Sequence, residues 1–238
     1  METYNTPFGN FSCLKNDQNF HFHLSHGCFW EIDLIMKDLR PYWQQASTIL
    51  DIGAHIGSHS FLYSHFNPQA KILAFEPQKE IYNVLLENMK ERPNVVPLNT
   101  CVGHMDQMTT LSQHTHCGEN TEKPIVYGEG PEMNLGGVSI GQGGQSVPMV
   151  RIDSLGLKSC DFIKLDVEGA EGLVIQGAAD TIRRFRPVIC YEYADYLDMS
   201  ELCRTLGLES LPNVKKELEA LGYKDFQHLG ADNWLALP

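Results

Sequence analysis

The stretch Ser47–Ser60, STILDIGAHIGSHS, decides the fold that this sequence predicts. Its apolar and β-branched run, residues 48–52, is typical of a buried strand. The small residues Gly53, Ala54 and Gly57 follow, and then an apolar pattern that suits a helix. A strand, a glycine turn and a helix bring the backbone close to a nucleotide-like ligand at the carboxyl edge of a sheet. The stretch therefore predicts an α/β protein with a ligand site at this turn.

Length, charge and cysteine content limit the class of protein. A chain of 238 residues can bury the core of one α/β domain, so we expect residues 1–238 to form a single domain. The net charge of −12 argues against nucleic acid as a partner, because phosphate binding needs clustered lysine and arginine. The seven scattered cysteines indicate reduced thiols in a cytoplasmic compartment. We find neither a signal peptide nor an apolar run that approaches the roughly 18 residues of a membrane span.

Strands and helices alternate along most of the chain, which favours a parallel sheet with helices on both faces. Residues 1–46 are expected to form an N-terminal arm with short strands and a helix over 28–45 that ends at Pro41. We expect five further strands, over residues 48–52, 71–77, 94–102, 161–166 and 186–193. Helices are expected after the glycine turn and over residues 78–91, 171–184 and 195–221, the last interrupted near Gly207 and Pro212. Two final strands, near 223–228 and 233–237, would complete a seven-stranded, Rossmann-like sheet as an antiparallel pair.

Residues 103–150 interrupt this alternation. They are rich in glycine and polar residues and have only a weak apolar period. A loop of this length inside a compact domain is usually functional or mobile. We interpret it as an insertion that contains a hairpin and covers the ligand edge of the sheet as a lid, with a backbone-exposing turn at Asn134–Ser139, NLGGVS. A variable surface loop is the alternative.

Two groups of histidines raise the question of a metal site. They are His21, His23 and His26 in the arm, and His114 and His116 beside Cys117 in the insertion. The His-x-His spacing on an extended segment is more often one solvated face, and no second cluster completes a zinc site. We therefore assign neither group to a metal.

Four acidic residues end four of the predicted strands: Asp51, Glu76, Asp166 and Glu192. A single acid at a strand end is ordinarily a cap or turn residue. The carboxyl ends of parallel strands, however, converge on one crevice, so four such acids indicate a shared site. Glu76 ends the strand after the glycine turn, where a carboxylate can accept hydrogen bonds from both ribose hydroxyls of an adenosine-type ligand.

The glycine spacing selects among nucleotide-like ligands. A dinucleotide turn needs G-x-G-x-x-G, which places the pyrophosphate on a helix N-terminus. The order Asp51-Ile-Gly53-Ala-His55-Ile-Gly57 fails that pattern and matches the (D/E)-x-G-x-x-x-G turn of S-adenosylmethionine enzymes. That cofactor ends in an amino acid, whose ammonium needs an acid such as Asp51 and whose carboxylate needs backbone N–H donors. A net-negative crevice also suits a sulfonium cation.

Five motifs together resemble the FkbM family of S-adenosylmethionine-dependent methyltransferases. They are, in chain order, DIGAHIG, FEP, NTCVG, KLDVEGAE and the closing NWLALP. The resemblance covers residues 47–238 and implies a class I methyltransferase fold, S-adenosylmethionine as cofactor, and O-methylation of a sugar, a glycan or a related natural product. It implies as cofactor residues Asp51, Gly53, Ala54, His55, Gly57, Glu76, Pro77, Asn99, Cys101 and Asp166. The family's usual turn has Asn in place of His55; because both residues tolerate left-handed backbone, we expect the turn to persist.

Methyl transfer to a hydroxyl requires that its proton be removed or its charge stabilised. A general base can do the first, and a divalent cation can lower the hydroxyl pKa. Asp166 and Glu192, on neighbouring strand ends, are our candidates for catalysis and also for binding Mg²⁺. Glu168 and Glu171 could add metal ligands, but at a helix start they equally complement the helix dipole, and for Glu171 we favour that structural role.

Other assignments stay open at this point. The base could instead be His55, His26 or His59, and the sequence does not choose among them. A nicotinamide-dependent oxidoreductase and a non-catalytic S-adenosylmethionine-binding module are the alternative functions. The missing G-x-G-x-x-G argues against the first, and the four retained acids argue against the second.

Overall fold

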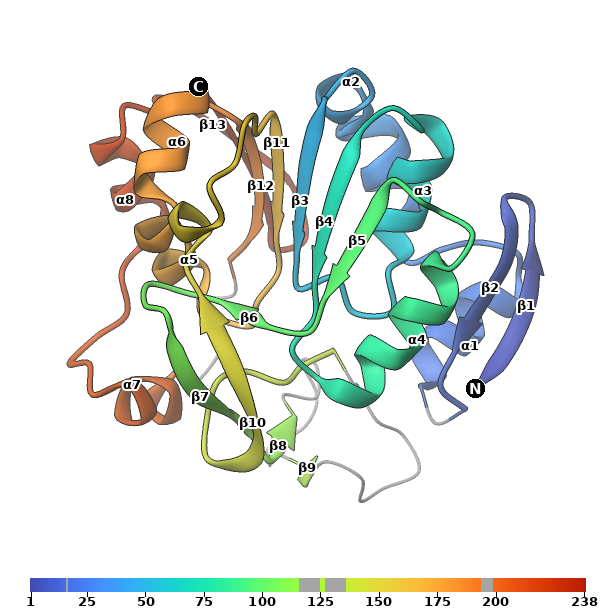
Figure 1. Ribbon diagram of the computed structural model, residues 1–238, viewed down its shortest axis with the longest axis horizontal. Helices are drawn as coiled ribbons and strands as arrows, with labels where there is room; N and C mark the ends of the chain where they lie inside the picture. Colours follow the sequence, from blue (N-terminus) through green and yellow to red (C-terminus); the bar gives the residue numbers. More distant parts are fainter. Residues whose placement is uncertain (16, 116–124, 127–135, 194–198) are drawn as a thin grey trace.

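The computed structural model describes residues 1–15, 17–115, 125–126, 136–193 and 199–238, and a seven-stranded sheet lies at its centre (Figure 1). The sheet has the strand order β13-β14-β12-β11-β3-β4-β5. In chain order its strands are β3 (Thr48–Ile52), β4 (Lys71–Phe75), β5 (Val95–Leu98), β11 (Phe162–Leu165), β12 (Val188–Glu192), β13 (Asp225–Gly230) and β14 (Asn233–Leu237). The first five run parallel, whereas β14 is antiparallel to both β12 and β13. The predicted sheet is confirmed.

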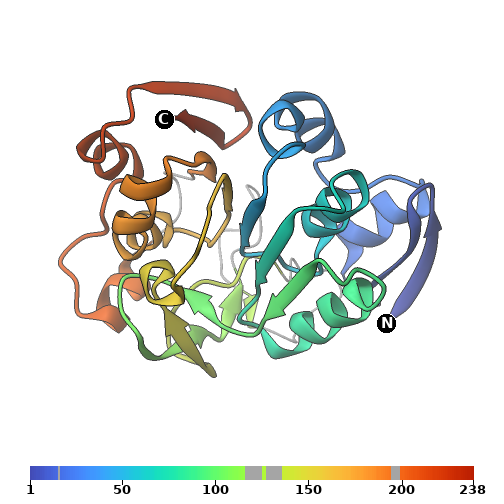
Figure 2. The same ribbon diagram turned by 45° about the horizontal axis from the view of Figure 1, so that its top comes forward.

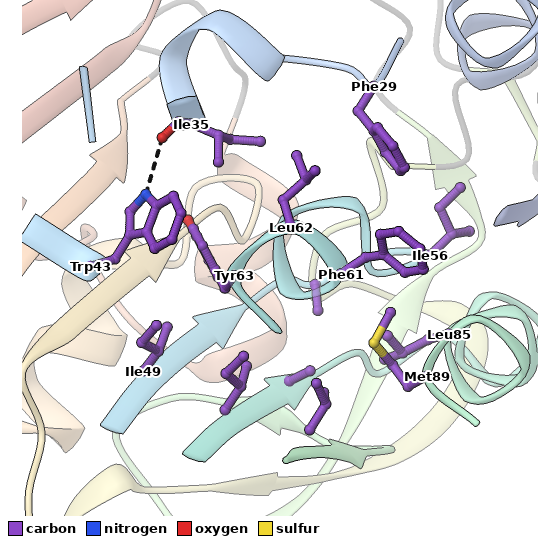
Figure 3. Packing of buried hydrophobic residues seen from close by; sticks show 14 of the residues in the cluster. Phe29, Ile35, Trp43, Ile49, Ile56, Phe61, Leu62, Tyr63, Leu85 and Met89 are labelled. Atoms are coloured by element: carbon purple, nitrogen blue, oxygen red, sulfur yellow. Dashed lines mark hydrogen bonds between the residues drawn. The ribbon is translucent and has the colours of Figure 1, made fainter. Parts of the chain in front are cut away.

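Helices cover both faces of the sheet because its side chains alternate between two apolar clusters (Figures 1 and 2). On one face, Ile49 of β3 packs beneath α3 (Ser58–Phe66) and α4 (Lys79–Met89); Figure 3 shows Leu62 and Leu85 of these helices in this cluster. On the other face, Leu50 packs with α5 (Glu171–Gly177), α6 (Ala179–Phe185) and α8 (Val214–Ala220). The alternation leaves the carboxyl edge of the sheet for polar residues.

The N-terminal arm contains the expected short strands, β1 (Glu2–Thr6) and β2 (Gly9–Cys13), and also an unpredicted helix, α1 (Gln18–Ser25). The prediction of a single helix over residues 28–45 is wrong, because two short helical turns occupy part of this range. A π-helical turn, η1 (Leu34–Asp38), is followed by the short α2 (Arg40–Trp43). Pro41 lies in the first turn of α2, where the missing N–H of proline costs no hydrogen bond, so it does not end the helix. The Trp43 indole donates to the Ile35 carbonyl at 3.0 Å (Figure 3) and ties the two turns together.

The strand predicted over residues 94–102 is two strands in two sheets. After β5 the chain leaves the central sheet, and β6 (Cys101–Val102) joins a second sheet with β10 (Gly143–Val150) and β7 (Gln107–Ser112). Asn99 lies at this exit, and its side chain donates to the carbonyls of Glu76 and Pro77 at 2.9 and 2.8 Å. Within the insertion, β7 and β10 pair antiparallel although the chain between them is long, and the pair lies below the carboxyl ends of the central strands in Figure 1. His116, Cys117 and the first two residues of the NLGGVS stretch lie outside the described residues.

The remaining helices are shorter than predicted. The helix expected over 171–184 is broken at Ala178 into α5 and α6, and a short 3-10 turn, η2 (Ile152–Leu155), precedes β11. The region expected over 195–221 contains α7 (Ser200–Leu206) and α8, with the predicted interruption between them; residues 194–198 lie outside the described part. Gly207 ends α7 in a left-handed conformation. In the part of the chain that the structure describes, no helix has the length and apolar character to cross a membrane.

Candidate active site

The four predicted acids lie at one edge of the sheet. Strand β3 pairs in parallel with β4 and β11, and β11 pairs with β12, so Asp51, Glu76, Asp166 and Glu192 stand at the carboxyl ends of four adjacent strands. Their charges interact, since Asp166 raises the pKa of both Glu76 and Glu192. The sequence thus predicted correctly that these acids converge.

The glycine turn after β3 packs directly against the turns that follow the neighbouring strands. The backbone N–H groups of Gly53 and Ala54 both donate to the Phe75 carbonyl, at 3.0 and 2.9 Å. Gly53 has φ +82°, and a Cβ added to it would stand 1.7 Å from the backbone oxygen of Asp166. Gly57 has φ +89°, and a Cβ there would meet Leu85 Cδ1 at 2.5 Å. Both positions therefore require glycine.

Glu76 is buried, and backbone donors on both sides hold its carboxyl group. Its Oε2 accepts from the N–H of His55 at 3.0 Å and its Oε1 from the N–H of Gln78 at 2.7 Å. Burial raises the pKa of Glu76 to about 8, although these two hydrogen bonds oppose the shift. Once ionised, a carboxylate has about four acceptor sites, so roughly two of those on Glu76 remain for a ligand. This arrangement fits a pair of ribose hydroxyls.

Three other predicted cofactor residues have contacts within the protein. Asp51 is buried, and its Oδ2 accepts from the Ser60 hydroxyl at 2.6 Å. Asn99 supports the turn at Pro77, as described above, and Cys101 is buried in β6, where burial raises its pKa to about 12. Contact of these residues with a cofactor stays a prediction.

His55 keeps the left-handed backbone that the glycine turn requires, with φ +51°. Its imidazole stacks on Phe20 of α1 with ring centroids 4.9 Å apart, and its Nε2 lies 3.8 Å from Asp17 Oδ2. Burial lowers the pKa of His55 to about 4, so the ring is neutral at pH 7. Both ring nitrogens and Asp17 Oδ2 are buried without a hydrogen-bond partner in the described residues. Orphaned polar atoms beside this turn fit the polar, amino-acid end of S-adenosylmethionine.

Asp166 and Glu192 form a hydrogen-bonded carboxyl pair. The charge of Asp166, together with burial, raises the pKa of Glu192 to about 10. Burial opposes the ionisation of Asp166, but the Lys164 ammonium and the hydrogen bond from Glu192 outweigh it and lower the Asp166 pKa. At neutral pH, Asp166 is therefore the ionised member and Glu192 the protonated one, as expected when two carboxyl groups share a site.

Lys164 is a member of the site that the sequence reasoning missed. It lies on β11, is 1% exposed, and its Nζ is 3.1 Å from Asp166 Oδ2. Burial opposes its charge, but Asp166, Glu31 and Glu192 keep the Lys164 pKa well above its ordinary value. A signal was available, because a lysine inside the apolar run DFIKLD must be paired if that run is buried.

Glu31 is the second missed residue, and it comes from the N-terminal arm. Its Oε1 accepts from the Asn233 side chain at 2.9 Å, and its Oε2 lies 3.3 Å from His59 Nε2. Burial would raise the Glu31 pKa, but the hydrogen bonds with His59 and Asn233 and the charge of Lys164 lower it to about 2. No local signal separates this acid from the others in the chain, since its partners lie in distant segments.

The remaining candidate base and metal residues differ in their surroundings. His59 is buried in the first turn of α3 and pairs with Glu31, whereas His26 is exposed just after α1, with Nδ1 2.7 Å from the Phe22 carbonyl. Glu171 accepts from the N–H groups of Val167 and Gly169, at 3.0 and 3.3 Å, which is a structural role in the turn before α5. Over the described ranges, no three His, Cys, Asp or Glu side chains are grouped so that they could hold a metal ion.

Residues 51–224 match the family model of the methyltransferase FkbM domain. The chain belongs to the FkbM methyltransferase family. Methyl transfer is the activity for which this family is named, and the strand order of the central sheet is that of the class I methyltransferase fold.

Two curated relatives are methyltransferases by name, one a 2-O-methyltransferase and the other a hexuronic acid methyltransferase. The chain is 30% identical to 2-O-methyltransferase NoeI of Sinorhizobium fredii over 165 residues, 62% of this chain and 63% of NoeI. It is 24% identical to hexuronic acid methyltransferase AglP of Haloferax volcanii over 162 residues, 67% of this chain and 62% of AglP. The chain thus spans less than two thirds of the length of either relative. The crystal structure of an FkbM methyltransferase from Methylobacillus flagellatus is 16% identical, with a TM-score of 0.49, over 81% of this chain and 44% of that one.

Proposed function

We propose that this chain is an S-adenosylmethionine-dependent O-methyltransferase that acts on a hydroxyl of a sugar, a glycan or a related natural product. The observation that carries the proposal is the position of Asp166 in an FkbM domain: its backbone lies directly against Gly53 of the glycine turn, and its carboxylate is 3.1 Å from the Lys164 ammonium. The acceptor class is supported by the printed names of NoeI and AglP.

The cofactor residues follow from the site geometry. Glu76 would accept hydrogen bonds from the ribose, and the turn Gly53–Gly57 would hold the amino-acid end, with Asp51, Ala54 and His55 around it. Pro77, Asn99 and Cys101 would border the adenine. When bound, S-adenosylmethionine would supply the methyl group: the acceptor oxygen would bond to the methyl carbon as the carbon–sulfur bond breaks, and S-adenosylhomocysteine would leave as the neutral thioether. The acids at this edge favour its positive charge.

Asp166 is the general base in this proposal. It is ionised, its side chain is one-third exposed, and Lys164 fixes one of its oxygens. The proton of the acceptor hydroxyl passes to Asp166 as the oxygen attacks. Glu192 keeps its own proton and donates to Asp166, which holds the carboxylate in place. Positioning contributes much of the rate in such a displacement.

Magnesium bound by Asp166 and Glu192 stays as the alternative way to activate the hydroxyl. We favour the metal-free form, because Lys164 already places a positive charge beside Asp166 and a hard cation needs six or more oxygen ligands. A small-molecule or glycan acceptor in a cytoplasmic setting also remains our prediction, with nucleic acid disfavoured by the net charge of −12.

The proposal is tested by screening free sugars, oligosaccharides and glycolipids for methyl transfer, with and without EDTA. We expect transfer to at least one hydroxyl acceptor, insensitive to EDTA, and loss of transfer in Glu76→Ala. In parallel, the binding of S-adenosylmethionine and of NAD to the protein is measured by calorimetry. Binding of NAD but not of S-adenosylmethionine would overturn the proposal in favour of an oxidoreductase, and S-adenosylmethionine binding without transfer to any acceptor would favour a non-catalytic module.

A further inference from the structure

We propose that Glu31 is a positioning residue of the methyl-transfer site, which holds the imidazole of His59 after the glycine turn and the side chain of Asn233 beside the strand end that carries Glu192. The inference rests on the proposed function. It makes the N-terminal arm a part of the site, although Glu31 lies outside residues 51–224, which match the family model.

The contacts of Glu31 join three segments that are distant in sequence. Asn233 begins β14 and pairs in register with Glu192 at the end of β12, so the Asn233–Glu31 hydrogen bond of 2.9 Å places Glu31 over the acid-bearing edge. His59 follows the glycine turn and lies 3.3 Å from the other Glu31 oxygen. Glu31 therefore bridges the cofactor turn and the strand end that carries Glu192.

Charge explains why a carboxylate is required at this position. Lys164 is buried and its ammonium bonds to Asp166, while Glu31 is a second negative neighbour that favours its charge. A buried ammonium is costly unless it is paired, and a second carboxylate nearby favours its charge further. Removing the Glu31 charge is therefore expected to act on Asp166 electrostatically, through the ammonium that pairs with it.

The backbone at Glu31 indicates that its placement is maintained against a local cost. Its φ is +54°, a left-handed conformation that is uncommon for glutamate. The flanking Phe29 and Ile35 are fully buried in the core and anchor the segment on both sides. Strained residues of this kind persist where the surrounding structure determines them, and they cluster at functional sites.

The test compares Glu31→Gln with Asp33→Asn in the full chain. Glutamine keeps the shape of Glu31 and removes its charge. Asp33, two residues away, is exposed and pairs only with Lys37 among the described contacts at 2.9 Å, so it is the matched control. We expect Glu31→Gln to lower kcat by about tenfold to a hundredfold, with the dissociation constant of S-adenosylmethionine unchanged. Its thermal midpoint should fall, because the substitution removes a buried charge that the fold favours, so kinetics are measured well below that midpoint. Asp33→Asn should behave as wild type. A wild-type kcat in Glu31→Gln, or a loss of cofactor affinity as large as the loss of kcat, would overturn the positioning role.

A second measurement separates this inference from the proposed function, because it needs no acceptor. In nitrogen-15 NMR of the histidine side chains, we expect the His59 signal to shift in Glu31→Gln and to stay in place in Asp33→Asn. An unchanged His59 signal would overturn the inference even if the wild type methylates sugars. If the wild type methylates nothing, the proposed function fails, whereas this comparison still decides whether Glu31 holds His59.

Discussion

At the residue scale, the burial of Glu76 makes the stability of the folded protein depend on pH. Its pKa of about 8 in the folded protein lies above its ordinary value of 4.5, so between these pH values the folded chain keeps a proton that the unfolded chain has lost. Glu76 therefore destabilises the fold increasingly as the pH rises from 5 to 8, and below about pH 4.5 this effect is absent. We expect Glu76→Gln to gain stability relative to wild type over that range, on the order of 2 kcal/mol. Urea unfolding at pH 5 and pH 8 measures this; parallel pH profiles of the two proteins would contradict it.

Substitution of Asp166 should reduce turnover far more than it reduces cofactor binding. Removal of the proposed general base with Asp166→Asn is expected to cut turnover by about 10² to 10⁴, while calorimetry finds S-adenosylmethionine bound nearly as tightly as by wild type. The control is Asp180→Asn, because Asp180 is exposed and pairs with Arg183 away from the site. Near-normal turnover in Asp166→Asn would remove Asp166 from the role of base.

At the element scale, the approach of the β3–α3 turn to the end of β11 depends on a missing side chain. We expect Gly53→Ala to lose cofactor binding and to unfold at a clearly lower temperature, since its methyl group would overlap the Asp166 carbonyl oxygen. Gly156→Ala is the matched control: its φ is also positive, +61°, but a Cβ there meets nothing within 4 Å. It should cost only the left-handed backbone strain, about 1 kcal/mol. Calorimetry and thermal unfolding of both variants check this, and equal effects would show that steric overlap is not the cause.

The elements also differ in how far the sequence could predict them. Strands β3, β4, β11 and β12 and helices α3 and α4 were predicted well, because each has a local apolar period and a clear turn at its end. The region before β3 was not, because η1 and α2 are short, and their form depends on the Trp43–Ile35 hydrogen bond and on core packing. The exit of the chain after β5 was also not predicted, since β6 pairs with β10, a strand more than forty residues later.

At the scale of the whole molecule, a ligand that binds only the folded state must stabilise it. At a concentration of 100 times its dissociation constant, S-adenosylmethionine should add about 2.7 kcal/mol to the free energy of unfolding. For a chain of this size that corresponds to a rise of about 5–10 °C in Tm. Thermal unfolding with and without the cofactor measures the shift, with NAD at the same concentration as control. A shift with NAD and none with S-adenosylmethionine would contradict the assignment of the glycine turn.

By itself, the sequence determined the parallel sheet, the glycine turn between Asp51 and Gly57, and the meeting of four acids at one edge. These follow from local periodicity and from the rule that parallel strands end on the same side. Only the tertiary structure decided which acid is ionised and which segments surround the acids. The ionisation of Asp166 depends on Lys164 and on the hydrogen bond from Glu192, which together outweigh burial. The charge of Lys164 is favoured in turn by Glu31 of the arm, which contacts Asn233 and His59. Charge energies depend on the distances between groups and on their exclusion from water, and both arise when residues distant in sequence fold together.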